Sequence, residues 1–278
     1  MQIRKIIVVM ALAVVWAFSS KAQVTPLSNA FAHNDYWHKR PLFDALSNGY
    51  TNVEADVYLY HNRLVVTHIL PILHHGRTLE DLYLKPLAEH ISQHNGKVYE
   101  NYDHPIILMI DIKSDANKTY ALLKPLLKKY ESILTGYQNG ELVTRQVKVV
   151  ISGHKPYEPL LEEKDRLAFI DEDLRKVTAD TTGRSTLFTM ASCKYSKLLN
   201  WKGKGILSIA QKNRLCNYVN EAHQNGVKVR LWASPDNQKV WQQLLQCGVD
   251  LINTDKLSRL RSFLVTNNNN NTPSTTRL

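Results

Sequence analysis

The chain has 278 residues and a formal net charge of +10, with 35 Lys and Arg against 25 Asp and Glu. This length suits one large α/β domain, and three Cys are too few for a scaffold stapled by disulfides. The basic charge favours anionic partners, but no Lys/Arg block, zinc-finger spacing or aromatic RNA-binding motif supports nucleic acid as the partner.

Residues 1–22 have the order of parts that is typical of a cleaved secretory signal. Arg4 and Lys5 precede an apolar run over residues 6–18, and small and polar residues follow up to Ala22. The run is shorter than the roughly 20 residues that a membrane anchor needs. We therefore predict a secreted or periplasmic product without stable membrane insertion. Its formal charge falls from +10 to +7, because three Lys and Arg residues are removed.

Short apolar segments then alternate with helical stretches over the predicted domain, residues 23–264. Eight segments rich in β-branched residues, with little strict alternation, are predicted strands covered on both faces. They lie at residues 30–33, 52–58, 106–113, 147–152, 167–171, 187–191, 227–233 and 249–254. Helical composition lies at residues 41–49, 78–93, 116–134, 213–226 and 237–248. This repeat predicts a (β/α)8 TIM-type barrel, although an open doubly wound sheet would show the same local pattern.

Several features lie outside that repeat. Residues 265–278 are rich in Asn and Thr and predict a disordered tail, and GILSIA at 205–210 fits either a strand or a loop. Cys193, Cys216 and Cys247 allow at most one internal disulfide, and none forms the C-x2-C pair of a zinc site. We expect a monomer.

Polar side chains close several of the early apolar segments, where a parallel barrel collects its functional groups. They are His33 after the first strand, Glu54 and Asp56 on one face of the second, His68 after the run RLVVTH, and Asp111 and Lys113 on one face of the third. Singly, each has an ordinary structural interpretation as a satisfied His or a paired charge. Three carboxylates on one face repel unless a cation or basic groups compensate, and oxygen-only ligands favour Mg2+ or Ca2+ as the cation.

These motifs resemble the phospholipase-C-like phosphodiesterase superfamily. The matching runs are HNDY, PLFDAL-x-x-GY, VEADV-x-L, LVVTH, TLEDLYLKPL, IDIK and the late LWASPDNQKVWQQLLQCGVDLINTDKL, which together cover nearly all of the predicted domain. The nearest branch is the "altered inheritance of mitochondria" type, with glycerophosphodiester phosphodiesterases as relatives. The resemblance implies a metal-dependent phosphoric diester hydrolase acting on a small glycerophosphodiester or phospholipid-headgroup-like substrate.

The resemblance also implies a role for each motif residue. His33 and His68 are the implied acid/base pair, Glu54, Asp56 and Asp111 the implied metal ligands, and Lys113 the implied phosphate contact. These roles are chemically consistent with one another, because a cation can neutralise the charge of the diester and a His side chain can gain or lose a proton near neutral pH.

The chain departs from glycerophosphodiester phosphodiesterases at two places. Those enzymes usually have Arg and Gly after the first His, where this chain has Asn34 and Asp35, and Glu where it has Asp111. We take Asn34 as a candidate substrate contact. Trp232, which ends the seventh strand, is a candidate wall for the alcohol part of the substrate or a core residue. Asp255 follows the last strand and is predicted to cap the next helix.

Two other functions fit the same sequence. One is a non-catalytic barrel that binds an anionic glycan or lipid headgroup, and the other is a lyase on this scaffold that releases a cyclic phosphate. No Walker-type loop, G-x-S-x-G elbow or dinucleotide fingerprint is present, which argues against nucleotide hydrolysis of that kind and against serine esterases.

Overall fold

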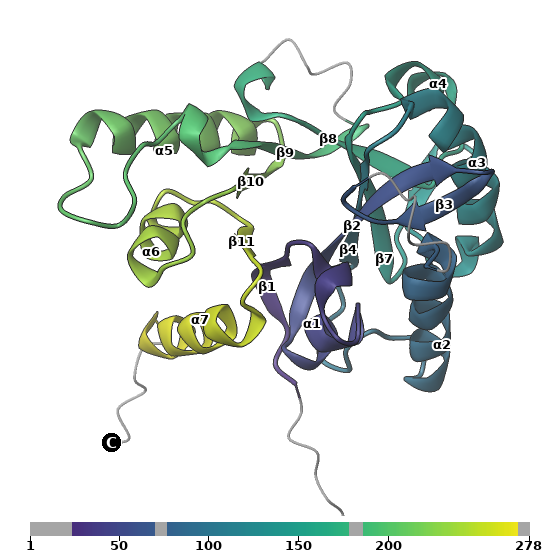
Figure 1. Ribbon diagram of the computed structural model, residues 1–278, viewed down its shortest axis with the longest axis horizontal. Helices are drawn as coiled ribbons and strands as arrows, with labels where there is room; N and C mark the ends of the chain where they lie inside the picture. The colour runs from purple at the N-terminus through teal and green to yellow at the C-terminus, as the bar shows by residue number, and fades with distance from the viewer. Residues whose placement is uncertain (1–23, 70–76, 178–185, 272–278) are drawn as a thin grey trace, which may run out of the picture.

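Eight parallel strands form a barrel in the computed structural model, which describes residues 24–69, 77–177 and 186–271 (Figure 1). The strands are β1 (Leu27–Ala32), β2 (Tyr50–Tyr60), β4 (Ile106–Ile112), β7 (Val147–Gly153), β8 (Ala168–Asp173), β9 (Phe188–Lys194), β10 (Lys228–Trp232) and β11 (Ile252–Thr254). They pair in the order β10-β9-β8-β7-β4-β2-β1-β11. A parallel bridge between Arg230 and Leu251 brings the two end strands together. The predicted (β/α)8 barrel is confirmed, because an open sheet would leave these edges apart.

Helices cover the outside of this barrel (Figure 1). They are α1 (Phe43–Ser47), α2 (Lys85–Gln93), α3 (Ala116–Lys129), α4 (Tyr157–Glu162), α5 (Ile209–Gln224), α6 (Gln238–Gln246) and α7 (Leu257–Asn271). The side chains of Asp115, Ser208 and Asn237 accept backbone N–H bonds at the starts of α3, α5 and α6. Gly49 ends α1 with φ +83°, and a Cβ there would lie 2.2 Å from the Thr25 carbonyl oxygen, so only glycine fits.

Several elements differ from the sequence-based expectation. β3 (Arg63–Val66) folds back antiparallel to β2 through His61 and Asn62, whose positive φ angles suit a tight hairpin turn. A second hairpin joins β5 (Gly136–Gln138) and β6 (Glu141–Val143). The segment GILSIA is a loop up to Ser208, and its last two residues begin α5.

The chain ends also bear on the predicted boundaries. The expected tail covers residues 265–278, and α7 continues helically into it as far as Asn271. The predicted signal at 1–22 lies outside the described residues. In the part of the chain that the structure describes, we find no helix with both the length and the apolar character that crossing a membrane requires.

The barrel interior has an apolar layer beneath a polar one. The apolar layer consists of Phe31, Ile107, Met109, Val150, Phe169, Met190 and Leu251. Because strand side chains alternate, the next inward positions lie two residues further along each strand. Six of these positions are polar, namely His33, Asp111, Ser152, Asp171, Ser192 and Asn253. The fold therefore gathers polar side chains at the carboxyl ends of the strands.

A disulfide ties two outer helices together. Cys216 in α5 bonds to Cys247 directly after α6, and Cys193 remains a buried thiol. The prediction of at most one internal disulfide with a thiol left over is confirmed.

Candidate active site

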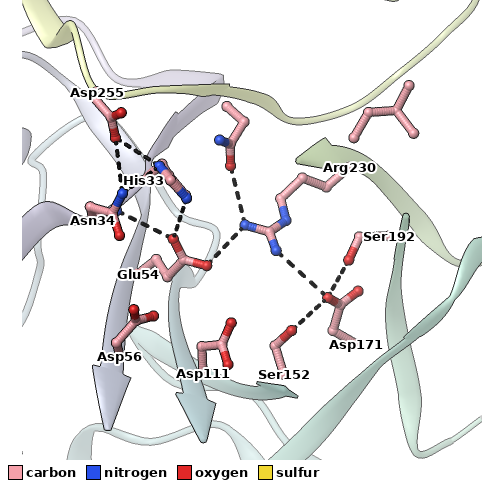
Figure 2. A network of polar contacts seen from close by, with 12 residues as sticks. His33, Asn34, Glu54, Asp56, Asp111, Ser152, Asp171, Ser192, Arg230 and Asp255 are labelled. Carbon is pink, nitrogen blue, oxygen red and sulfur yellow. Dashed lines mark hydrogen bonds and ion pairs between the residues drawn. The ribbon is translucent and has the colours of Figure 1, made fainter. Parts of the chain in front are cut away.

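Three carboxylates from neighbouring strands meet at the carboxyl end of the barrel (Figure 2). Glu54 and Asp56 come from β2 and Asp111 from β4, where Asp56 and Asp111 are register partners. One oxygen of each lies within 4.8 Å of the others. Glu54 and Asp56 are buried, so water compensates their charges little. We name this group the acidic cluster.

Two cations compensate part of its charge. The Arg230 Nη1 atom lies 3.2 Å from Glu54 Oε1, and both side chains are buried. The Lys113 Nζ atom lies 3.3 Å from Asp56 Oδ1 and 3.1 Å from Asp111 Oδ2. The cluster thus has three acidic groups and two basic groups in direct contact.

The carboxyl groups respond differently to burial. Burial alone would raise the pKa of Glu54, but the charges of Arg230 and then His33 hold that pKa below its usual value. Burial raises the pKa of Asp111 to about 6, and the neighbouring carboxylates add to this effect while Lys113 opposes it. Lys113 therefore compensates the charge of Asp111 only in part.

One carboxylate oxygen of Asp111 lies in a space next to Gly153 on the neighbouring strand β7. This oxygen, Oδ1, is buried and has no hydrogen-bond partner among the described residues. A Cβ at Gly153, the last residue of β7, would lie 2.1 Å from this atom. Glycine at this position leaves the space that the free oxygen of the carboxylate occupies.

His33 follows β1 and lies beside Glu54. Its Nδ1 atom is 2.7 Å from Asp255 Oδ1, and its Nε2 atom is 3.7 Å from Glu54 Oε2 (Figure 2). Burial acts to lower the pKa of His33, but the Asp255 hydrogen bond and the two carboxylate charges outweigh it and raise the pKa. The prediction that Asp255 caps the next helix is wrong, because strand pairing between β1 and β11 brings its carboxylate to the imidazole instead.

Asn34 is held between these groups. Its backbone N–H donates to Glu54 Oε2 over 3.3 Å from a left-handed conformation with φ 48°. Its amide nitrogen lies 3.4 Å from Asp255 Oδ1, and its Oδ1 accepts a bond from the Tyr36 hydroxyl at 2.8 Å. The Asn34 side chain is buried.

His68 lies on another side of the same cluster. Its Nδ1 atom is 2.5 Å from Asp56 Oδ2, which also contacts the Tyr36 hydroxyl at 2.8 Å. The His68 side chain is 52% exposed, so its other ring nitrogen is open to a ligand. The structure thus brings together both predicted imidazoles and all three predicted carboxylates, each imidazole against a different carboxylate.

A second polar group lies across the barrel mouth, and apart from Ser152, which ends a predicted strand, its members are not among the residues that the sequence indicates. Asp171 Oδ2 accepts bonds from Ser192 and, at 3.1 Å, from Ser152, and lies 3.9 Å from Arg230 Nη2 (Figure 2). Burial raises the pKa of Asp171 although Arg230 opposes the shift. The sequence does contain an indication of this group, because Arg230 is a charged residue in the otherwise apolar middle of the strand β10. His154 is exposed and contacts the Ser114 carbonyl oxygen, as a loop residue does.

A cavity of about 360 Å³ opens beside the cluster and is lined by Lys113 and Trp232 among others. Trp232 is 39% exposed, so it forms part of the wall and is not a core residue. Larger cavities of about 470 and 590 Å³ lie elsewhere, but none of the acidic cluster lines them. Of these three cavities, the one at the barrel mouth is therefore the candidate active-site cavity.

Comparison with known proteins agrees with this geometry. Residues 19–171 match the model of the AIM6-like phosphodiesterase domain, and residues 228–258 match the Glycerophosphoryl diester phosphodiesterase family. A solved glycerophosphodiester phosphodiesterase from Parabacteroides distasonis has the same fold, with a TM-score of 0.51 and 16% identity over 88% of this chain and 99% of that chain.

Curated relatives carry the name "Altered inheritance of mitochondria protein 6". The protein from Lachancea thermotolerans is 31% identical over 85% of this chain and 66% of its own length. The protein from Eremothecium gossypii is 29% identical over 86% of this chain and 70% of its own length. The chain thus spans about two thirds of the first relative. Together with the domain match over more than half of its residues, this similarity shows that the chain belongs to the AIM6-like phosphodiesterase family.

Proposed function

We propose that the protein is a metal-dependent phosphoric diester hydrolase that acts on a small glycerophosphodiester or phospholipid-headgroup-like substrate. One observation carries the proposal: three carboxylates converge at the barrel mouth, and two imidazoles contact them from different sides. Membership of a phosphodiesterase family supports the reaction class.

The acidic cluster fits a hard divalent cation such as Mg2+ or Ca2+. Its donors are all carboxylate oxygens, within 4.8 Å of one another, and the buried Asp111 Oδ1 lacks a partner among the described residues. Glu54, Asp56 and Asp111 would hold the ion. When bound, it would neutralise and orient the phosphodiester. The remaining chemistry falls to the side chains around it.

The two imidazoles suit proton transfer. Asp255 holds His33 by Nδ1 and so directs Nε2 toward Glu54 of the cluster. Asp56 of the cluster holds His68 by Nδ1, so that the Nε2 atom of His68 lies on the side of the ring away from that carboxylate. We assign one ring to take the proton of the attacking oxygen and the other to protonate the leaving oxygen. Because Asp255 helps to raise the pKa of His33, that ring keeps its proton to a higher pH, and we assign it as the proton donor.

Two further residues serve the substrate, and a third positions His33. Lys113 supplies a cation beside Asp111 for a phosphate oxygen, and Trp232 supplies an apolar wall for the alcohol. Asn34 was expected to contact the substrate, but its amide already bonds to Asp255 and Tyr36. We therefore assign Asn34 to positioning His33.

The disulfide supports the proposed location outside the cytoplasm. Disulfides persist in oxidising compartments such as the periplasm, and Cys216 pairs with Cys247 here. Together with the signal-like residues 1–22, this supports a secreted or periplasmic protein.

Hydrolysis of bis(p-nitrophenyl) phosphate, measured with Mg2+, Ca2+ or a chelator, tests the proposal. We expect His33→Ala and His68→Ala each to lower kcat on the order of 10²–10⁴-fold, the range for a lost acid or base. His94→Ala is the control, because this exposed His at the end of α2 bonds only to its own helix. Unchanged activity in either site variant, or full activity with chelator, would overturn the assignment. Phosphorus NMR of the product separates hydrolysis from release of a cyclic phosphate.

A further inference from the structure

The cavity beside the acidic cluster has a second wall, of which the proposed hydrolysis uses only Trp232. This wall is formed by residues at or after the carboxyl ends of β7, β9 and β10. Its cationic members are Lys155, Lys194 and Lys197, and Trp232 stands among them. We name these four residues the lysine wall.

The lysine wall is built on firmly held backbone. Lys194 is the last residue of β9 and pairs in register with Trp232 on β10, so its ammonium group lies 5.6 Å from the centre of the indole ring. The next residue, Tyr195, is buried and donates its hydroxyl hydrogen to the Trp201 carbonyl oxygen over 2.6 Å. That anchor holds the turn that carries Lys197. The cations therefore start from fixed positions.

The acids that line this cavity already have close partners, whereas the charge of the lysine wall is met only in part, by Asp171 acting on Lys155 and by the Trp232 ring beside Lys194. Glu54 pairs with Arg230, Asp111 with Lys113, and Asp173 with Arg175 at 2.6 Å. Asp171 accepts hydrogen bonds from two serines and lies 3.9 Å from Arg230. Within the described residues, none of the three lysines has a carboxylate within the 4.0 Å that defines an ion pair. The remainder of their charge is left for a ligand.

The phosphodiester does not account for that charge. A diester carries one negative charge, and Lys113 beside the acidic cluster already supplies a cation for it. A phosphomonoester carries about two negative charges near neutral pH and three acceptor oxygens. Several ammonium groups match it well, whereas a carboxylate is better matched by a planar Arg fork, and Arg175 is occupied by Asp173.

We propose that the lysine wall binds a phosphomonoester on the alcohol part of the substrate, so that the substrate is a small phosphodiester with a second, terminal phosphate. Trp232 then faces the carbon skeleton between the two phosphates. This inference rests on the proposed hydrolase function and narrows its substrate class.

The test compares glycerophosphoglycerol with its terminal phosphomonoester, using phosphorus NMR to obtain kcat/KM for each. We expect the wild-type protein to prefer the phosphorylated diester. Lys194→Met with Lys197→Met lowers that preference about tenfold or more, since two charged contacts to the terminal phosphate are lost. The preference also declines as salt is added, because these lysines are exposed.

A matched control removes two positive charges from the segment that connects β9 to α5. Lys202→Met with Lys204→Met lies in the exposed loop after β9 but outside the cavity, so the preference stays at the wild-type value. Equal kcat/KM for the two diesters in the wild type, or equal loss of preference in both double variants, overturns the lysine wall and leaves the hydrolase function standing. Failure to hydrolyse either diester overturns the hydrolase function itself.

Discussion

His33 lies between two carboxylates that reach it from opposite ends of the chain. Glu54 and Asp255 both act to raise its pKa, against the effect of burial. With a folded-state pKa above that of the unfolded chain, these contacts stabilise the folded protein fully below the usual histidine pKa. Their contribution is lost as the pH rises through the raised value.

Asp255→Asn should therefore lower the pKa of His33, because it removes a charge and the strongest acceptor of the imidazole N–H. In the pH profile of the reaction rate, the limb that reflects the ionisation of His33 then moves to lower pH. An NMR titration of the histidine rings measures the pKa directly. Asp250→Asn is the control, because it breaks the similar 2.8 Å contact with His223 on α5. A His33 pKa that stays in place would show that Asp255 is not its partner.

Gly153 decides whether Asp111 can face the other acids. Gly153→Ala places a Cβ against Asp111 Oδ1, and we expect the carboxylate to move and affinity for Mn2+ or Mg2+ to fall about tenfold or more, as measured by calorimetry. Gly140→Ala has nearly the same positive φ but nothing within 4 Å of the new Cβ, so it carries the backbone strain alone. Equal affinities in the two variants would contradict a steric role for Gly153.

The segment that follows β1 is held in place by the buried carboxyl group of Asp35. Asp35 Oδ2 accepts bonds from the Leu42 backbone N–H at 2.5 Å and from the Tyr83 hydroxyl at 2.9 Å. Leu42 has φ 65°, a strained value that these contacts help to hold. Burial raises the pKa of Asp35 to about 6. The negative charge of Asp35 therefore opposes folding near neutral pH. The contribution of Asp35 to the free energy of unfolding rises as the pH falls toward the pKa that this carboxyl group has in the unfolded chain.

Asp35→Ala leaves two buried donors without an acceptor, and we expect the free energy of unfolding to fall by about 2 kcal/mol. Urea unfolding at pH 7 measures this change. Asp44→Ala at the start of α1 is the comparison, since its contacts with Arg40 are on the surface and contribute about 0.5 kcal/mol. Equal losses in both variants would exclude a structural role for Asp35.

The disulfide links α5 to the end of α6 over a separation of 31 residues. Replacing Cys216 and Cys247 by Ser should lower the free energy of unfolding by about 3 kcal/mol, because the unfolded chain regains freedom. Denaturant curves with and without reductant test this. A thiol assay should find no reactive Cys in the folded protein and one after unfolding, since Cys193 is buried. A thiol count of three in unreduced unfolded protein would contradict the pairing.

The acidic cluster couples the whole barrel to a cation, because its ligands come from β2 and β4 and exist as a set only when the sheet is formed. At a concentration one hundred times its Kd, a bound ion stabilises the fold by about 2.7 kcal/mol. Thermal unfolding with Mg2+ or Ca2+ should show a higher Tm that chelator reverses. Asp56→Asn should abolish the rise, whereas Asp173→Asn, in the same cavity but outside the cluster, should keep it. A rise that persists in Asp56→Asn would place the ion elsewhere.

The amino-acid sequence by itself determined the eight strands, because a short apolar segment rich in β-branched residues is a local property of the chain. Residues two apart on a strand share a face, so the sequence also put Glu54 and Asp56 on one side of theirs. It therefore placed Glu54, Asp56 and Asp111 on the barrel mouth. Only the tertiary structure decided which distant groups complete the site. Asp255 meets His33 across 222 residues and Arg230 meets Glu54 across 176, and these contacts depend on how the sheet closes. Strand pairing is non-local, so no spacing in the sequence records it.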